Sequence, residues 1–139
     1  MADAAPSPRP RPISPQVQLN GGVWRWHLTM AASILHRVTG VGLYIGAPVL
    51  MVWALCLASG QGAYAAFAGL AGSILGKAGL FLLTLCVFYH LANGVRHLAW
   101  DFGYGFKPST ATQTASLVIG VAVVATLALW VLLAVTGAL

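Results

Sequence analysis

Two histidines and a glycine at helical spacing are the residues best suited to chemistry in this sequence. His90, Gly94 and His97 occur at positions i, i+4 and i+7, so on a helix they share one face. Gly94 has no side chain and leaves a flat notch beside the backbone, into which a flat cofactor could fit. His90, Gly94 and His97 lie at the end of a long apolar segment. A histidine deep in a membrane segment is costly, so function is the default hypothesis for it.

The composition places these residues in a membrane protein. Of the 139 residues, 59% are hydrophobic and only 6% are charged, against roughly a quarter charged in soluble domains. The net charge of +5 comes from basic residues at the edges of apolar segments, so we expect membrane lipid and no nucleic acid as a partner. The first residues have no apolar core of a signal peptide. We therefore expect a multi-pass protein of the bacterial inner (cytoplasmic) membrane.

Three apolar segments predict an all-α bundle of three transmembrane helices that runs up, down and up. Each segment can cross a hydrocarbon layer of about 30 Å. The predicted spans are residues 30–58, 73–100 and 113–135. Together they form one transmembrane domain, residues 30–139, which follows a proline-rich cytoplasmic arm and interfacial segment, residues 1–29.

The connections and the basic residues predict the orientation. The first connection, residues 59–72, has no charge and has room for a short interfacial helix. Basic residues gather near the start of the first span and around the second connection, whereas the opposite side has only Lys77. The first group is Arg9, Arg11, Arg25, Arg37, Arg96 and Lys107. The excess of positive charge predicts a cytoplasmic N-terminus and a periplasmic C-terminus.

His90 is the candidate for metal chemistry. It lies roughly 10 Å deeper in the membrane than His97, at ~1.5 Å per helical residue. A neutral imidazole nitrogen there could be an axial haem ligand. A carbonyl group or a water molecule on a neighbouring helix could equally satisfy a buried histidine. A zinc or copper site that pairs Cys86 with His90 has too few ligands.

A haem bound by His90 would need a second ligand at the same depth. Arg37 and Arg96 both mark the cytoplasmic rim, so His36 is expected level with His97 and not with His90. The third span has no histidine or methionine. The chain therefore offers one ligand, and a six-coordinate haem would need a partner subunit.

Several polar residues gather at the same rim. His36, Arg37 and His97 could orient the chain by reaching the headgroups, or they could hold anionic propionates. Ser33 lies one helical turn before Arg37, so both could donate hydrogen bonds to a quinone carbonyl. Asp101, just beyond the rim, could pair with an arginine or supply protons.

The combined motifs resemble the family of succinate dehydrogenase cytochrome b556 subunits, the larger membrane anchors of respiratory complex II. The similarity spans nearly the whole chain. It is carried by Arg-Pro-Ile-Ser-Pro at 11–15, Ser-Ile-Leu-His-Arg-Val-Thr-Gly at 33–40, His-x3-Gly-x-Arg-His at 90–97 and Asp-Phe-Gly-Tyr at 101–104. One departure is Gln16, where many relatives have histidine.

The resemblance implies roles for individual residues. His90 would be the axial ligand of one b-type haem, with the second ligand from a small hydrophobic anchor subunit. His36, Arg37, His97 and Gly94 would surround the haem and its propionates. Ser33 and Arg37 would line the ubiquinone site.

The resemblance also implies partners and a reaction. An iron–sulfur subunit and a flavoprotein with FAD would dock on the cytoplasmic face, and electrons would pass from succinate to ubiquinone. The chain would oxidise nothing alone. Two other functions are compatible with the sequence: a haem-free structural anchor or assembly protein, and a transporter component. A transporter usually shows repeats or broken helices, which are not visible here.

Overall fold

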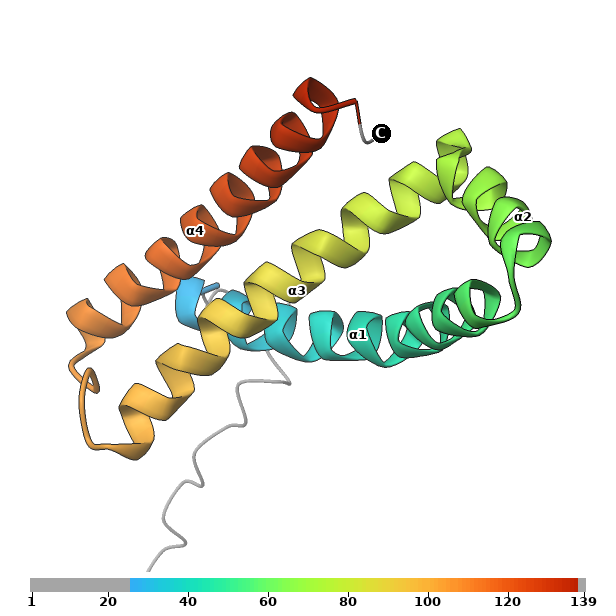
Figure 1. Ribbon diagram of the computed structural model, residues 1–139. Helices are drawn as coiled ribbons and strands as arrows, with labels where there is room; N and C mark the ends of the chain where they lie inside the picture. Colours follow the sequence, from blue (N-terminus) through green and yellow to red (C-terminus); the bar gives the residue numbers. More distant parts are fainter. Residues whose placement is uncertain (1–25, 138–139) are drawn as a thin grey trace, which may run out of the picture.

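The chain folds into four helices across residues 26–137, which are the residues that the computed structural model describes (Figure 1). The helices are α1 (Leu28–Ala58), α2 (Gln61–Gly72), α3 (Ile74–Asp101) and α4 (Pro108–Val135). No strand occurs in this range, so the predicted all-α class is confirmed. Most of the predicted cytoplasmic arm, including Arg9, Arg11 and Arg25, lies outside the described residues.

Three of the helices are long and apolar enough to cross a membrane. The helices α1, α3 and α4 contain 31, 28 and 28 residues, with mean hydropathies of 2.1, 1.8 and 2.8. This confirms the three expected spans, with two shifts at their ends. The helix α4 begins at Pro108 and not near residue 113, because proline is well suited to the first helical position. Asp101, expected in the second connection, is the last residue of α3.

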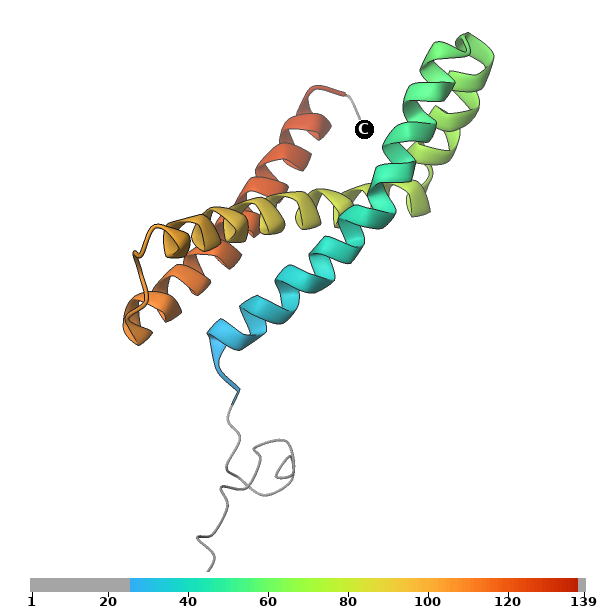
Figure 2. The same ribbon diagram turned by 90° about the horizontal axis from the view of Figure 1, so that it is seen from below.

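The first connection contains the short helix for which the sequence has room. The chain leaves α1 through Gly60, whose φ of 101° is in the left-handed region that favours glycine. After α2, Ser73 caps α3 by accepting a hydrogen bond from the Gly76 amide at 3.1 Å. In Figure 2, α2 lies at the far end of α1 and returns the chain to α3.

The helix α3 lies between α1 and α4 and contacts both (Figures 1 and 2). Along the contact with α4, Tyr89, Val118 and Ala122 form a buried apolar cluster. The buried residues of α4 recur every three or four positions, which is one face of a helix. They are Ala115, Val118, Ala122 and Thr126.

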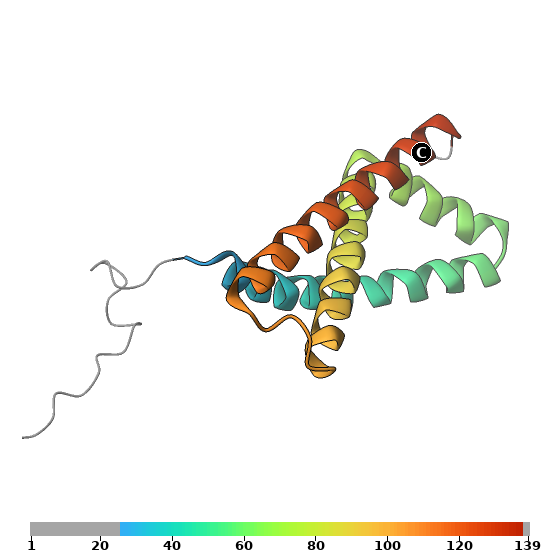
Figure 3. The same ribbon diagram turned by 90° about the vertical axis from the view of Figure 1, so that its left-hand side faces the viewer.

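Glycines let α1 cross close to α3. A Cβ atom on Gly42 would lie 2.9 Å from the Cys86 Sγ, and one on Gly40 would lie 3.2 Å from Cε1 of His90. Only small residues permit so close an approach between helices. In Figure 3, α1 runs across α3, and Figures 1 and 2 show the oblique crossing of the two helices. The crossing brings the first half of α1 against the imidazole of His90.

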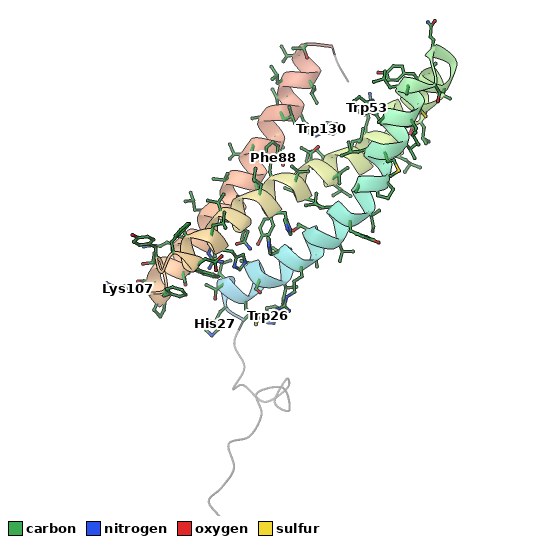
Figure 4. All side chains as sticks on the ribbon, turned by 60° about the horizontal axis from the view of Figure 1, so that its bottom comes forward. Trp26, His27, Trp53, Phe88, Lys107 and Trp130 are labelled. Atoms are coloured by element: carbon green, nitrogen blue, oxygen red, sulfur yellow. The ribbon has the colours of Figure 1, made fainter. Side chains whose placement is uncertain are left out.

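The helical bundle has two unlike ends (Figure 4). We call the first the polar end: residues 26–40 of α1 and its approach, residues 89–107, and residues 108–118 of α4. We call the second the α2 end: residues 49–84 and the end of α4 from Thr126. Figure 4 shows His27 and Lys107 at the polar end, and Trp53 and Trp130 at the α2 end.

Candidate functional site

Three histidines meet where α1 crosses α3. The rings of His36 and His90 stack with centroids 3.9 Å apart and planes 14° apart. The ring centroids of His36 and His97 are 5.0 Å apart. His36 therefore contacts both histidines, and the expectation that it lies level with His97 and not with His90 is wrong with respect to His90. Because α1 crosses α3 obliquely, counting residues from the rim does not predict which side chains of the two helices meet (Figures 1 and 2).

Hydrogen bonds fix the tautomer of His90. Its Nδ1 lies 3.2 Å from the carbonyl oxygen of His36 and 3.3 Å from the hydroxyl of Thr39. The Thr39 hydroxyl itself donates to the carbonyl of Leu35 at 2.8 Å, so its oxygen is free to accept. A carbonyl oxygen can only accept, so Nδ1 carries the proton and Nε2 keeps its lone pair. A neutral imidazole held in this way is the usual form of a metal-ligating histidine.

His36 has a polar atom that its own chain does not satisfy. Its Nδ1 is buried and has no hydrogen-bond partner among residues 26–137. Buried polar atoms in folded proteins nearly always have a partner, so a group from outside the chain is expected near it. The stacked rings also limit the chemistry. Imidazoles that lie face to face cannot direct nitrogen atoms at opposite sides of one iron, so His36 and His90 do not form a bis-histidine pair.

The two glycines near His90 have different surroundings. Gly40 contacts the His90 ring, as described above. A Cβ atom on Gly94 would meet nothing within 4 Å, so the notch expected there is open to whatever lies beside the chain. The role of Gly94 as a cofactor surface stays a prediction.

Arg96 belongs to a buried network that the sequence interpretation missed. The side chain is 6% exposed, so it is buried against its neighbours. That Arg96 marks the cytoplasmic rim stays a prediction. It donates from Nε to the hydroxyl of Thr114 at 3.0 Å, from Nη2 to the carbonyl of Ala111 at 3.0 Å, and from Nη1 to Oδ1 of Asn93 at 3.3 Å. Arg96 thereby ties α3 to the start of α4.

A periodic signal could have revealed this network. Tyr89, Asn93 and Arg96 have the same i, i+4, i+7 spacing as His90, Gly94 and His97, one residue earlier. They are the buried residues of α3. The Tyr89 hydroxyl donates to the carbonyl of Ala32 at 2.8 Å. Two adjacent faces of α3 therefore carry polar groups.

Asn93 and Trp100 connect this network to His97. The Asn93 Nδ2 lies 3.4 Å from the His97 Nε2. The His97 ring meets Trp100 edge to face, with centroids 5.1 Å apart, and the Arg96 guanidinium lies 4.0 Å from the centre of the Trp100 ring. The Trp100 Nε1 donates to the carbonyl of Gly105 at 3.3 Å. This contact holds the connection between α3 and α4 against the end of α3.

The remaining predicted residues lie at the same end of the molecule. Ser33 is half-buried and Arg37 is exposed, one helical turn apart on α1. Asp101 is exposed at the end of α3. The structure thus brings His36, His90 and His97 into contact. The roles of Ser33, Arg37 and Asp101 stay predictions.

Comparison with known proteins identifies the family. Residues 7–138 match the family described as succinate dehydrogenase/fumarate reductase transmembrane subunit. The chain is 36% identical over 121 residues to the succinate dehydrogenase cytochrome b556 subunit of Rickettsia felis, which covers 87% of this chain and 91% of that protein. It is 35% identical over 124 residues to the mitochondrial succinate dehydrogenase cytochrome b560 subunit of Homo sapiens. This match covers 86% of this chain and 69% of that protein. The chain therefore belongs to the transmembrane subunits of the succinate dehydrogenase/fumarate reductase family.

Proposed function

We propose that this chain is the larger membrane anchor of a succinate:ubiquinone oxidoreductase, and that it binds one haem b together with a second, small hydrophobic anchor subunit. The relatives are named as subunits of succinate dehydrogenase, which supports the assignment to this complex. The observation that carries the haem assignment is the tautomer of His90, whose Nδ1–H is engaged by the His36 carbonyl and by Thr39. That arrangement leaves the Nε2 lone pair for a metal.

The residues around His90 fit the edge of a haem. Nε2 of His90 would be one axial ligand, and the group would supply a one-electron redox centre when bound. Open space at Gly94 would admit the flat ring. His36, Arg37 and His97 would meet the propionates, which suit positive or hydrogen-bond-donating groups. The second axial ligand would come from the small anchor subunit, because His36 stacks on His90 and cannot oppose it.

Ser33 and Arg37 would bind ubiquinone at the polar end. The hydroxyl of Ser33 and the guanidinium of Arg37 both donate hydrogen bonds, and a quinone carbonyl accepts them. Arg37, one helical turn after Ser33, would serve both the quinone and a propionate. Asp101 is exposed at the same end and would pair with a partner's cation or supply protons for quinone reduction.

The polar end would face the cytoplasm of a bacterium, with the protein in the inner membrane. Arg37, Arg96 and Lys107 lie there, against Lys77 at the α2 end. An iron–sulfur subunit would dock on this face and deliver electrons from a flavoprotein with FAD. Within this arrangement, the chain alone would have no succinate-oxidising activity.

The composition and spectrum of the purified complex test this proposal. A tag on this chain should retain the flavoprotein, iron–sulfur and small anchor subunits in equal amounts. The complex should reduce ubiquinone with succinate, and dithionite should produce a b-type absorption band. An equimolar complex without that band would favour a haem-free structural anchor instead. Failure to retain the other subunits would contradict the proposal as a whole.

A further inference from the structure

The contact between Arg96 and Asn93 has only one chemically possible direction. A guanidinium donates hydrogen bonds and cannot accept them. The Asn93 atom that lies 3.3 Å from the Arg96 Nη1 is therefore the carbonyl oxygen, Oδ1. Arg96 is itself held in place by Thr114, by the carbonyl of Ala111 and by the face of Trp100. The amide of Asn93, which is fully buried at 0% exposure, cannot turn over without losing this contact.

The orientation of the amide determines which nitrogen of His97 carries the proton. With Oδ1 toward Arg96, the amide nitrogen faces His97 and lies 3.4 Å from its Nε2. An amide nitrogen only donates, so Nε2 of His97 must accept. In the neutral ring the proton is then on Nδ1. No hydrogen bond joins Nδ1 of His97 to another residue within the range 26–137.

We propose that Arg96 and Asn93 are positioning residues that hold His97 as its neutral Nδ1–H tautomer, so that His97 presents an N–H donor to an oxygen acceptor from outside the chain. The proposal rests on the function proposed above for the identity of that acceptor, a haem propionate. Its chemical class, a carboxylate or carbonyl oxygen, follows from the donor alone. Trp100 adds to the positioning. It packs edge to face with the His97 ring, and the Arg96 guanidinium lies over its ring.

A substitution at Asn93 can move the proton of His97 from Nδ1 to Nε2. Asn93→Asp has nearly the same shape and keeps an acceptor for Arg96, so the link between α3 and α4 is retained. A carboxylate cannot donate, however, so it would require a proton on Nε2 of His97. Thr114→Val is the matched control. It removes the partner of the Arg96 Nε but leaves Asn93 and its two contacts in place.

The experiment is solid-state NMR of the whole complex in lipid, reduced with dithionite and labelled with ¹⁵N in the histidine rings. His97→Gln identifies the His97 signals by their loss. In the wild type and in Thr114→Val, Nε2 of His97 should resonate as an unprotonated nitrogen and Nδ1 as a protonated one. In Asn93→Asp, the Nε2 signal should move to the protonated position.

Two results would overturn the proposal. One is a protonated Nε2 of His97 in the wild type, which can be read even when a variant does not assemble. The other is an unprotonated Nε2 in Asn93→Asp. The absorption spectrum of the same sample separates this test from the proposed function. A missing b-type band removes the propionate as the acceptor, whereas an intact band with the wrong tautomer removes the role of Arg96 and Asn93.

Discussion

The two ends of the molecule are held together by different forces. At the polar end, hydrogen bonds cross between helices: Tyr89 donates to the Ala32 carbonyl, the His90 ring bonds to the His36 carbonyl, and Arg96 donates to Thr114 and Ala111. At the α2 end, Thr126 is buried but donates only to Ala122 of its own helix. Within the described residues, the one side-chain hydrogen bond between two helices there is donated by Trp130 to Thr84 at 3.4 Å.

The difference indicates where function lies. Polar groups are expensive in a membrane, so buried ones are kept where chemistry or assembly needs them. The α2 end has instead a hollow of about 580 Å³ between the helices, lined in part by Trp53, Lys77 and Trp130. Aromatic contact, such as that between Phe81 and Trp130, holds it together. The polar end is built for a fixed arrangement of groups, whereas the α2 end is anchored by apolar packing.

The first prediction concerns the side of the membrane on which each end lies. The bias of basic residues places the polar end in the cytoplasm and the chain terminus at Leu139 in the periplasm. A reporter fused after Leu139 should be active only if it is a periplasm-sensing one. Activity of a cytoplasm-only reporter at that position would reverse the two ends.

The second prediction compares the stabilising role of a cation at each end. Arg96→Leu leaves the buried Oδ1 of Asn93 without its donor, which costs about 1–3 kcal/mol, and removes the bonds of Arg96 to Thr114 and Ala111. Lys77→Leu removes a cation whose side chain makes no hydrogen bond or ion pair with the described residues. Thermal unfolding of the solubilised complex should therefore occur at clearly lower temperature for Arg96→Leu and be nearly unchanged for Lys77→Leu. Equal losses would mean that the two ends are stabilised alike.

The third prediction concerns the quinone. Ser33→Ala removes one neutral donor, worth about 1 kcal/mol or roughly fivefold in rate, and Arg37→Ala removes a charged donor, worth about tenfold or more. Succinate oxidation with a soluble artificial acceptor should stay nearly intact in both. Parallel loss of both activities would indicate an assembly defect and would remove these residues from the quinone site.

The fourth and smallest prediction uses the two glycines near His90. A Cβ on Gly94 meets no atom of the described chain, and alanine is favoured over glycine in a helix by about 0.5–1 kcal/mol. If a haem ring occupies that space, Gly94→Ala should lower haem content without lowering thermal stability. Gly40→Ala should displace the His90 ring by a few tenths of an ångström and shift the reduced spectrum at nearly normal haem content. Normal haem content and spectrum in Gly94→Ala would mean that the notch is not a haem surface.

The sequence predicts the helices well because their signals are local. The three apolar spans and the short helix in the first connection follow from composition and spacing. The depth of His36 does not, because it depends on how obliquely α1 crosses α3. The burial of Arg96 does not follow either, because an arginine near the end of an apolar segment has the same local pattern whether it reaches the headgroups or is buried against α4.

Part of the site is therefore predictable and part is not. The shared face of His90, Gly94 and His97 is a property of one helix. The contacts of His90 with His36 and Thr39, and those of Arg96 with Thr114, join different helices and need the tertiary structure. The roles of Ser33, Arg37 and Asp101 remain predictions from spacing and resemblance, as does the cytoplasmic arm predicted for residues 1–25.

The most direct test of the central claim is the reduced absorption spectrum of the purified complex carrying His90→Ala, beside His27→Ala as the control. His27 lies at the polar end, just before the start of α1, and within the described residues it makes no hydrogen bond or ring contact with the three clustered histidines. We predict that His90→Ala alters the b-type band, lowers haem content, or both, whereas His27→Ala matches the wild type. An unaltered low-spin b-type spectrum at full haem content in His90→Ala would contradict the assignment of His90 as the axial ligand.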